Sequence, residues 1–196
     1  SNPMQQKLFR HALEIGRKYN LECKSRCKRP SPMLAMEYKV FDKMVLRLVR
    51  KQLGLENANI FPTAGAAVSP EVERFAHSVG LNMVVGYGLT ESLATVSCDR
   101  ENMPYTIGSV GRPINGIDVK IGDNDEILLK GPTITVGYYR RDAANKEAFT
   151  EDGYFRTGDA GYIKNGELFL TDRIKDLFKT SNGKYIAPQM IESLLL

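Results

Sequence analysis

A nine-residue stretch near the middle of the chain constrains its fold more than any other. Residues 84–92 begin as a short apolar run, continue through two glycines that bracket Tyr87, and end in three polar residues. This pattern predicts a strand that carries polar groups to its C-terminal edge, where open α/β sheets bind their ligands. Tyr87 offers a stacking face, Thr90 can donate to a phosphate oxygen and Glu91 can bind Mg²⁺. A plain strand-to-turn junction with one exposed acid explains these nine residues equally well.

A second glycine-containing strand end precedes this stretch. Residues 60–63 predict a short strand that runs into the small residues 64–67, which include Gly65 and Ala66. A helix is predicted from Ser69 to Gly80, because Ser69 is a good N-cap and a proline follows it at the first helical position. With the strand at 81–85, this gives a β-α-β unit of a parallel sheet, whose two strand ends could hold a flat ring between them.

The first 60 residues predict two packing helices and carry most of the positive charge. Apolar residues at helical spacing predict helices over 4–19 and 35–53, the second with a buried and a basic outward face. Residues 1–60 hold 13 Lys and Arg against 5 Asp and Glu, whereas the remaining residues hold 14 against 18. An acidic partner or a solvated helical face would explain this excess, and we favour the second. In the second helix the expected buried residues are Met36, Val40, Phe41, Met44, Val45, Leu48 and Val49, and the expected outward ones are Lys39, Lys43, Arg47 and Arg50.

The residues after Ser92 predict a small antiparallel β subdomain. Strands 117–121 and 126–130 flank Gly122–Asp125, and strands 162–164 and 167–170 flank Asn165-Gly166, a strong signal for a two-residue hairpin. The dense charge cluster at 172–176 reads as a linker. A strand at 177–180 and a helix from Pro188 follow it.

Other features exclude several classes of protein. No apolar run approaches the length of a membrane span and the N-terminus lacks a signal peptide, so we expect a cytoplasmic protein. The three cysteines have no zinc-like spacing and are expected to be reduced bystanders. His11 and His77 are isolated, and each is expected to be a surface or packing residue.

Taken together, the motifs resemble those of the adenylate-forming superfamily, which contains acyl-CoA synthetases, luciferases and peptide-synthetase adenylation domains. Five segments fall in the family order over roughly residues 60–190, and the helices before them and the residues after 179 resemble the long-chain fatty acyl subgroup. One such match would be weak, but five in order make chance improbable. The segments are Gly65–Ala67, Tyr87–Glu91, Gly131-Pro132 with Gly137–Tyr139, Tyr154–Asp159 and Asp172–Asp176.

The resemblance implies an α/β fold: part of the large domain of an adenylate-forming enzyme, with the start of its mobile C-terminal domain. The implied parts are residues 3–100 as helices and the βαβ portion of the AMP-binding domain, 101–171 as the antiparallel subdomain, 172–176 as a hinge linker, and 177–196 as the start of the C-terminal domain.

The resemblance also implies a role for each matching position. Gly65 and Ala66 would contact adenine, Tyr87 would stack on it, and Gly88 would belong to the same nucleotide-binding set. Thr90 would hydrogen-bond the α-phosphate and Glu91 would hold Mg²⁺, which makes these two the catalytic pair. Asp159 would bind the ribose hydroxyls, Arg173 would donate to ribose or phosphate, and Lys175 matches the hinge. From chemistry alone, the simpler interpretations are that Asp159 caps a turn and that Arg173 pairs with Asp172 or Asp176 on the surface.

The implied reaction is ATP-dependent activation of a fatty acid to an acyl adenylate and then to acyl-CoA, with ATP or AMP, Mg²⁺ and coenzyme A bound. The expected partners are these small molecules and no nucleic acid; peripheral contact with a membrane and self-association stay open. Activation of an aryl, short-chain or amino acid is one alternative. A non-catalytic nucleotide- or nucleic-acid-binding module is another, because of the basic first third.

Two family features have no counterpart in this sequence. A Ser/Thr/Gly-rich phosphate loop that ends in Pro-Lys-Gly should precede the Gly65 segment, and an adenylation lysine should follow near the family's C-terminus. We therefore expect the chain to be an internal fragment of a ligase, with little or no ligase activity on its own.

Overall fold

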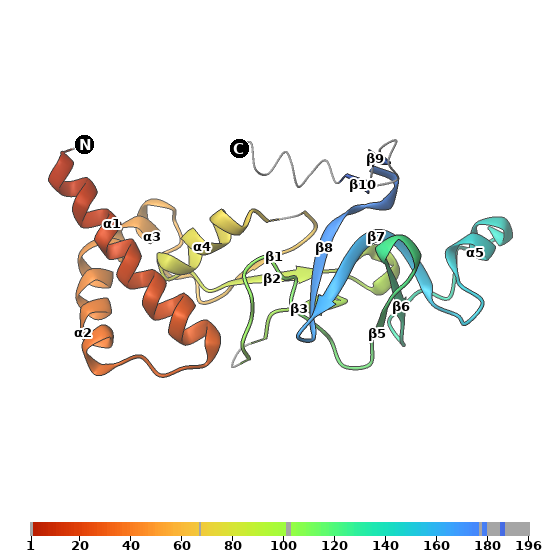
Figure 1. The fold of residues 1–196 in the computed structure, drawn as a ribbon, viewed down its shortest axis with the longest axis horizontal. Helices are drawn as coiled ribbons and strands as arrows, with labels where there is room; N and C mark the ends of the chain where they lie inside the picture. Colours follow the sequence, from red (N-terminus) through yellow and green to blue (C-terminus); the bar gives the residue numbers. More distant parts are fainter. Residues whose placement is uncertain (1, 67, 101–102, 177, 180–184, 187–196) are drawn as a thin grey trace. The chain divides into compact units, whose positions relative to one another are not determined.

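The computed structural model describes residues 2–66, 68–100, 103–176, 178–179 and 185–186. These residues form two compact units, one made of Ser1–Val85 with Asp99–Gly108 and one made of Gly86–Cys98 with Ser109–Leu196. Helices dominate the first unit and strands the second (Figure 1). Strand β2 (Met83–Tyr87) belongs to both, because it passes from the first unit into the second after Val85.

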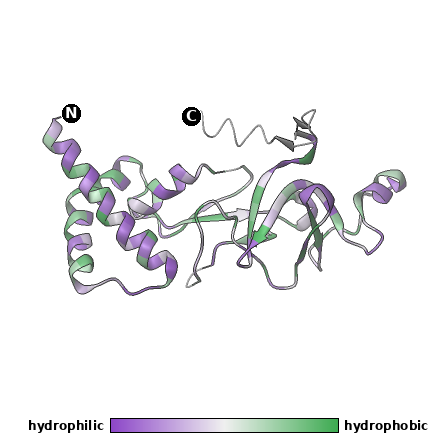
Figure 2. Cartoon of the chain, viewed as in Figure 1, coloured by the Kyte–Doolittle hydropathy of each residue, from purple (hydrophilic) through white to green (hydrophobic). Residues whose placement is uncertain are grey.

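The first unit begins with helix α1 (Pro3–Arg17), which confirms the first predicted helix. Asn2 caps it by accepting a hydrogen bond from the backbone N–H of Met4, and Pro3 occupies its first turn. Hydrophilic and hydrophobic residues alternate around α1 (Figure 2). The other helical segments of this unit are the π-helical turn Lys18–Cys23, the 3-10 turn Lys24–Arg26, α2 (Pro32–Phe41), the π-helical turn Asp42–Leu46, α3 (Arg47–Gln52) and α4 (Pro70–Ser78).

Helix α1 packs closely against the end of α4 through a glycine. A Cβ placed on Gly16 would lie 1.9 Å from the carbonyl oxygen of Ser78, so a side chain at this position would force the helices apart. Ala12 and Ile15 are buried on the same helix, and Leu46 of the following segment is fully buried beside them in the core of the unit. The contact explains why a glycine occupies the apolar side of an otherwise regular helix.

The second predicted helix exists, but its predicted burial is largely wrong. It starts earlier, at Pro32, because Ser31 caps it by accepting from the backbone N–H of Leu34. The predicted core residues Met36, Val40, Met44 and Leu48 are between 49% and 66% exposed, whereas Phe41, Val45 and Val49 are half-buried.

A π-helical turn over Asp42–Leu46 explains part of the difference, because its extra residue rotates the side chains that follow relative to an ideal α-helix, although Met36 and Val40 precede it. As a result Leu46, which the helical pattern did not select, is fully buried. Arg50, predicted to face outward, has only 13% of its side chain exposed. It forms a 2.7 Å ion pair with Asp42 and donates to the carbonyl oxygen of Val79 at 2.6 Å.

The predicted β-α-β unit is confirmed. Strand β1 (Phe61–Thr63) pairs in parallel with residues 83–85 of β2, in the register Phe61↔Met83 and Thr63↔Val85, and α4 forms the crossover. Ser69 caps α4 and Gly80 follows it at φ +84°, as the sequence pattern predicts. Side chains alternate along β2, which places Met83, Val85 and Tyr87 in buried positions.

A buried polar cluster joins α4 to residues 103–108. His77 is 5% exposed and its Nε2 lies 2.7 Å from the Tyr105 hydroxyl, which confirms that this histidine is a packing residue. One turn earlier, the Glu73 side chain is 1% exposed and accepts a hydrogen bond from the Gly108 N–H at 2.8 Å. Burial raises the pKa of the Glu73 carboxyl to about 7 and lowers the pKa of His77 to about 4.

The second unit is built on a four-stranded antiparallel sheet in the order β5-β6-β7-β8. Both predicted hairpins are present: β5 pairs with β6, and β7 turns into β8 at Asn165-Gly166, where both residues have the positive φ that a type I′ turn requires. Ile127, Leu129 and Leu168 are fully buried in this unit. The four strands are β5 (Asp118–Ile121), β6 (Glu126–Lys130), β7 (Phe155–Lys164) and β8 (Glu167–Arg173).

Shorter elements complete the second unit. The end of β2 pairs antiparallel with β3 (Ser97–Cys98), which pairs with β4 (Arg112–Pro113). Helix α5 (Asp142–Ala148) was not predicted, because it is short and has neither a side-chain cap nor a buried face. The predicted linker 172–176 begins inside β8 and continues as the 3-10 turn Ile174–Asp176. Strands β9 (Phe178–Lys179) and β10 (Tyr185–Ile186) pair with each other.

Two remaining expectations concern the ends of the chain and the cysteines. The helix expected from Pro188 lies outside the described residues. All three cysteines are free thiols, as predicted. Among the residues that the structure describes, no helix combines the length and the apolar character needed to cross a bilayer.

Candidate functional site

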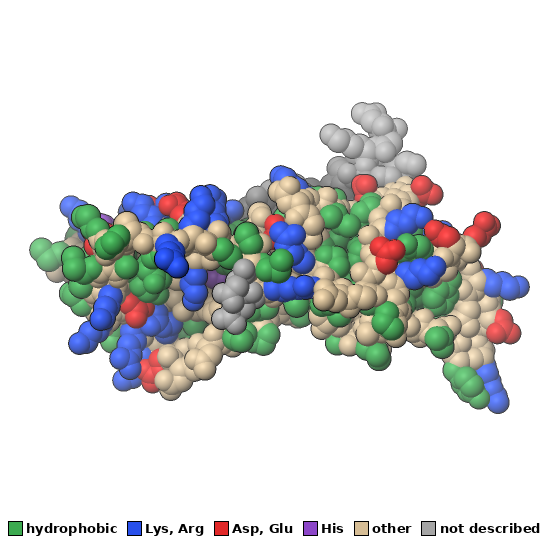
Figure 3. Space-filling view, turned by 90° about the horizontal axis from the view of Figure 1, so that it is seen from below, with side chains coloured by type: hydrophobic (Ala, Val, Ile, Leu, Met, Phe, Trp, Pro, Cys, Tyr) green, Lys and Arg blue, Asp and Glu red, His purple; other side chains and the backbone are tan. Residues whose placement is uncertain are grey.

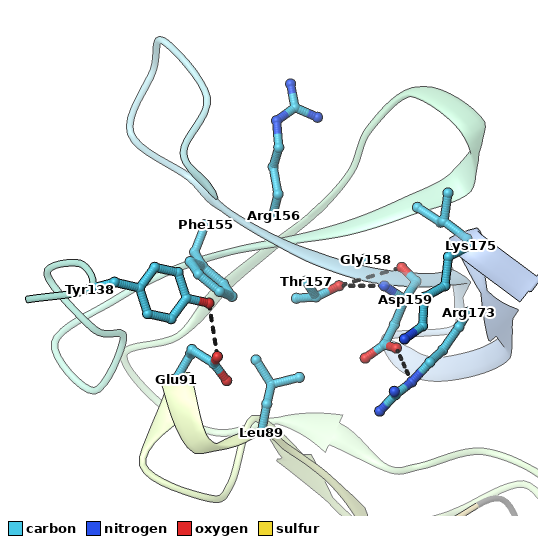
Figure 4. A pocket seen from close by; sticks show the side chains of 11 residues that line it. Leu89, Glu91, Tyr138, Phe155, Arg156, Thr157, Gly158, Asp159, Arg173 and Lys175 are labelled. Atoms are coloured by element: carbon cyan, nitrogen blue, oxygen red, sulfur yellow. Dashed lines mark hydrogen bonds and ion pairs between the residues drawn. The ribbon is translucent and has the colours of Figure 1, made fainter. Parts of the chain in front are cut away.

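A cavity of about 490 Å³ lies within the second unit, beside the turn after β2 that carries Glu91 (Figure 4). Its volume is in the range of small-molecule binding sites. Residues from the turn after β2, from the segment before α5, and from β7, β8 and the turn after β8 line it. The lining residues are Leu89, Glu91, Tyr138, Phe155, Arg156, Thr157, Gly158, Asp159, Arg173, Ile174 and Lys175.

Glu91 is held at one end of the cavity by contacts to its side chain and its backbone. It lies in the 3-10 turn Thr90–Ser92, and its Oε1 accepts a 2.9 Å hydrogen bond from the Tyr138 hydroxyl. Its carbonyl oxygen accepts from the backbone N–H of Thr135 at 2.7 Å. Partial burial and the neighbouring Glu91 carboxylate raise the pKa of Tyr138, so this hydroxyl stays a donor at neutral pH. One carboxylate oxygen is thus committed to Tyr138, and the other remains available to a ligand.

The Tyr138 backbone is fixed by a side chain of helix α5. The N–H of Tyr138 donates to Asn145 Oδ1 at 2.7 Å, and Asn145 Nδ2 donates back to the Tyr138 carbonyl at 3.0 Å. This reciprocal pair ties the segment that carries Tyr138 to a helix that sequence reasoning missed. Helix α5 therefore contributes to the site by positioning Tyr138, although it does not line the cavity.

Asp159 lies at the other end of the cavity, on strand β7. Its backbone N–H donates to Thr157 Oγ1 at 3.1 Å, and that hydroxyl donates to the carbonyl of Ile127 at 2.7 Å. These contacts anchor this part of β7 to β6. Its Oδ2 accepts a 2.7 Å hydrogen bond from the Tyr87 hydroxyl. The Asp159 side chain is 17% exposed, so it is well ordered by its neighbours but still reaches the cavity.

Two cations stand next to Asp159. Strand pairing places Arg173 directly opposite it, and the Arg173 Nε lies 3.6 Å from Asp159 Oδ1. The Arg173 side chain is 61% exposed, so this is a weak pair that a ligand can replace. Lys175 follows in the next turn and lines the same cavity. Figure 4 shows Glu91 with Tyr138 on one side, and Asp159 with Arg173 and Lys175 on the other.

The arrangement suits a ligand that is anionic and carries hydroxyl groups. The carboxylates of Glu91 and Asp159 lie at opposite ends of the cavity. One can therefore hold a cation while the other accepts hydrogen bonds from hydroxyl groups. Two exposed cations at one end can meet phosphate oxygens. Leu89 and Phe155 give the wall between them an apolar surface (Figure 4).

The structure brings together three of the predicted site residues, Glu91, Asp159 and Arg173, with the predicted hinge residue Lys175. Thr90 is exposed and its side chain is not part of the cavity lining. Gly65, at φ +90°, and Ala66 belong to the first unit, so their contact with adenine stays a prediction.

Tyr87 and Gly88 have clear structural roles in the turn that leads to Glu91. Tyr87 is 7% exposed, and burial together with Asp159 raises the pKa of its hydroxyl, which is therefore a donor to Asp159. A Cβ on Gly88 would lie 1.3 Å from the carbonyl oxygen of Ala94, so only glycine fits there. Their predicted contact with adenine is neither needed for these roles nor tested by them.

Sequence reasoning missed Tyr138 and Thr157 as site residues. Both lie in segments that belong to the motif series, Gly137–Tyr139 and Tyr154–Asp159, but a motif match alone gives a tyrosine or a threonine no role. Their functions follow only from contacts across 47 residues to Glu91 and across 30 residues to Ile127. In the sequence, the only sign of these roles was that each residue carries a hydroxyl group within a matched motif.

The residues present fit a magnesium ion that is held mainly by a nucleotide. Within the described part of the chain, no group of three or more His, Cys, Asp or Glu could hold a metal by itself. Mg²⁺ usually takes one or two protein carboxylates and fills its other positions with phosphate oxygens and water. Glu91 meets that requirement, because its second carboxylate oxygen has no hydrogen-bond partner among the residues that the structure describes.

Comparison with known proteins identifies the family from the sequence. The family model of the AMP-binding enzymes matches residues 23–139. A long-chain-fatty-acid–CoA ligase, FadD15 of Mycobacterium bovis, is 37% identical over 172 residues, which cover 86% of this chain and 28% of the relative. Long-chain-fatty-acid–CoA ligase 1 of Schizosaccharomyces pombe is 39% identical over 145 residues, covering 67% and 21%. The chain thus spans less than a third of the length of these relatives.

Two solved structures share the fold. The O-succinylbenzoate coenzyme A synthetase of Bacillus subtilis, in complex with ATP and magnesium, superposes with a TM-score of 0.63 at 24% identity, over 86% of this chain and 39% of that one. MatB of Rhodopseudomonas palustris superposes with a TM-score of 0.62 at 26% identity, over 79% and 33%. The matched sequence model covers more than half of the chain, and the chain belongs to the family of AMP-binding enzymes, with the α/β fold of the adenylate-forming enzymes.

Proposed function

We propose that the protein takes part in ATP-dependent activation of a long-chain fatty acid, first to an acyl adenylate and then to acyl-CoA. The observation that carries the proposal is the single cavity that Glu91, Asp159 and Arg173 share, in a chain 37% identical to a long-chain-fatty-acid–CoA ligase. In the first step a carboxylate oxygen of the acid bonds to the α-phosphorus and pyrophosphate leaves. In the second, the thiol of coenzyme A bonds to the acyl carbon and AMP leaves.

Glu91 is proposed to anchor the metal-bound phosphates. The free oxygen of its carboxylate would contact Mg²⁺, and the Tyr138 hydroxyl would keep the carboxylate turned into the cavity. When bound, the ion would neutralise charge on the phosphate oxygens as they are displaced. Thr90, next in the same turn, is proposed to hydrogen-bond the α-phosphate.

The far end of the cavity is proposed to hold the nucleoside. Asp159 has two acceptor oxygens, which match two ribose hydroxyls, and Arg173 can donate to ribose or to phosphate. Because the Arg173–Asp159 pair is exposed and 3.6 Å long, a ribose hydroxyl could insert with little loss. Gly65, Ala66, Tyr87 and Gly88 are proposed to surround the adenine, as the family resemblance implies.

Lys175 is proposed to be the hinge residue about which a C-terminal domain turns between the two steps. It lies in the 3-10 turn that follows β8, directly after the last residue of the sheet. Its long, exposed side chain stays solvated on both sides of a large rotation, as a hinge of this kind requires. Coenzyme A would approach from the C-terminal side, beyond this turn.

Binding of AMP to the 196-residue chain, measured by titration calorimetry, tests the site. Asp159→Ala removes the proposed ribose acceptor, and we expect the affinity for AMP to fall by about tenfold or more, since a hydrogen bond to a charged group contributes roughly 1.5–3 kcal/mol. Asp152→Ala is a matched control, because Asp152 is an exposed aspartate of the same unit that pairs with Lys120 outside the cavity.

Equal effects of Asp159→Ala and Asp152→Ala would contradict the assignment of Asp159 to the nucleoside. Asp159→Asn checks for a folding artefact, because it keeps the acceptor that receives the Tyr87 hydroxyl. If Asp159→Asn restores the melting temperature but not the affinity, the loss belongs to the ligand contact.

A second candidate substrate is another carboxylic acid. Proteins with this fold include synthetases named for O-succinylbenzoate and for anthranilate, so the fold does not restrict the acid. A panel of aryl, short-chain and long-chain acids, offered with ATP to the full gene product, separates the candidates. Failure of every long-chain acid to support adenylate formation would overturn the choice of substrate while leaving the nucleotide site intact.

A further inference from the structure

Helices α2 and α3, with the π-helical turn between them, present an apolar stripe to the solvent. Five large apolar side chains recur every three or four residues along residues 33–48 and are each about half or more exposed. Their spacing keeps them on one side of a continuous helical segment of 21 residues. The exposed fractions are 68% for Met33, 66% for Met36, 49% for Val40, 55% for Met44 and 56% for Leu48.

Basic side chains border this stripe. Lys39, Lys43, Arg47 and Lys51 are all exposed, and every other exposed residue between Pro32 and Gln52 is apolar or uncharged. The two acids of the segment are less exposed than these cations: Glu37 is half-buried, and Asp42 is paired with Arg50 at 2.7 Å. The exposed surface of the segment is therefore apolar and positively charged, with no exposed acid.

The opposite side of the segment is fixed to the rest of the unit. Leu46 is fully buried, and Arg50 bridges Asp42 to the carbonyl of Val79 beyond the end of α4. This underside holds the helix in place, so the outward stripe is a preformed surface that needs no folding on contact. Hydrophobic and basic side chains intermingle over the helical unit in the space-filling view (Figure 3).

We propose that the α2–α3 surface is a docking site for an anionic lipid bilayer. A helix with an apolar stripe and basic borders lies in the plane of a membrane interface, with its apolar side among the acyl chains and its cations among the headgroups. Each lysine or arginine near an anionic surface adds roughly 1 kcal/mol of attraction. Another protein surface would have to desolvate or pair these four cations, none of which forms an ion pair among the described residues. Charge complementarity therefore selects the lipid surface.

Vesicle sedimentation tests the proposal without any nucleotide, so its outcome is independent of the proposed function. The chain should sediment with vesicles of equimolar phosphatidylglycerol and phosphatidylcholine and should bind pure phosphatidylcholine vesicles much more weakly. Lys43→Glu with Arg47→Glu should weaken binding to the anionic vesicles by about tenfold or more. Met36→Ser with Met44→Ser should weaken it as well, because both stripe residues lose buried apolar area.

Matched controls come from the second unit. Lys146→Glu with Lys164→Glu reverses two exposed charges, and Val136→Ser removes an apolar side chain that is fully exposed. Neither should change vesicle binding. Circular dichroism checks that each variant keeps the parent's helical content, which is expected because all altered side chains are exposed.

Four outcomes would overturn the proposal. They are absence of binding to anionic vesicles at low salt, equal binding to both vesicle types, equal weakening by the control variants, and a dimer of the chain that Met36→Ser with Met44→Ser dissociates. The last would assign the stripe to a second copy. The full product of the gene is assayed in parallel, and binding by the chain without binding by that product would show that other residues cover the stripe.

Discussion

At the scale of single residues, Glu91 carries the strongest prediction. In the full gene product, Glu91→Ala should slow adenylate formation about a hundredfold, because it removes the carboxylate proposed to hold the metal where charge develops. Transfer of the acyl group from adenylate to coenzyme A should be affected much less, since pyrophosphate has already left. ATP–pyrophosphate exchange measures the first step and conversion of synthetic acyl adenylate measures the second. Equal losses in both would refute the assignment.

Tyr138 is predicted to act through Glu91 as a positioning residue. Tyr138→Phe removes only the hydroxyl that donates to Glu91 Oε1 at 2.9 Å, so affinity for Mg·ATP should fall about three- to tenfold. Binding of AMP without metal should stay unchanged, which a general loss of structure would not permit. Calorimetry of the 196-residue chain with both ligands gives the comparison.

The next residue supplies the control for Tyr138. Tyr139 is 83% exposed and does not line the cavity, so Tyr139→Phe should leave both affinities at the parental value. If Tyr138→Phe weakens AMP and Mg·ATP alike, its role is structural and the positioning role is wrong.

The site residues could be predicted from their positions in the family motifs, but not from the physical pattern of the residues around them. On their chemistry alone Asp159 looked like a turn cap and Arg173 like the partner of Asp172 or Asp176, whereas the structure pairs Arg173 with Asp159 on the neighbouring strand. Only the order of the motifs marked them as site residues. Tyr138 was missed because its role comes from a contact 47 residues away, which no local pattern contains.

At the scale of elements, the buried polar cluster that joins α4 to residues 103–108 should make the stability of the protein depend on pH. The pKa of Glu73 is raised to about 7 from its usual 4.5, so between these values the folded protein binds more protons than the unfolded chain. The free energy of unfolding therefore falls as pH rises through this window, and the effect is complete above pH 7. A shift of this size corresponds to roughly 3 kcal/mol.

Glu73→Gln should remove that dependence while keeping an acceptor for the Gly108 N–H. Relative to the parent, the variant should gain stability steadily from pH 4.5 to pH 7, as measured by urea unfolding followed by circular dichroism. The pKa of His77, lowered to about 4, gives an opposite slope between that value and about 6.5, but this titration is common to both proteins and cancels in the difference. A difference that stays constant with pH would show that Glu73 is ionised in the folded state.

The elements that the sequence predicted best were those with local signals. Ser69 with the following proline located the start of α4, and Asn165-Gly166 located the β7–β8 turn, because capping and positive φ are properties of one or two residues. Burial from Asp42 onward was predicted badly, because a π-helical turn and the Arg50 contact to Val79 decide it. Helix α5 has no periodic apolar face, and so left no pattern to detect.

At the scale of the whole molecule, each unit has its own core and its own part of the family motifs. The Gly65 segment lies in the first unit, whereas Glu91, Asp159 and Arg173 lie in the second. The cavity in the second unit contains the carboxylates and cations proposed to bind the nucleotide. We therefore expect this chain to bind AMP. The boundaries proposed for the mobile domain, at 172–176 and 177–196, stay a prediction.

Catalysis is a different matter from binding in a chain that spans 28% of the ligase it resembles. The family's phosphate loop and adenylation lysine, which would hold the pyrophosphate and the reacting carboxylate, have no counterpart in this sequence. Glu91 and Asp159 would still bind the nucleotide, but without those two motifs the acid would not be held in line with the α-phosphate, and a reaction is accelerated only when its reacting groups are so positioned. The 196-residue chain should therefore bind AMP but show no ATP–pyrophosphate exchange with a long-chain fatty acid above the rate of a boiled sample. Robust exchange by the purified chain would mean that the residues described here suffice for the first step, and that the missing motifs contribute less than the family pattern implies.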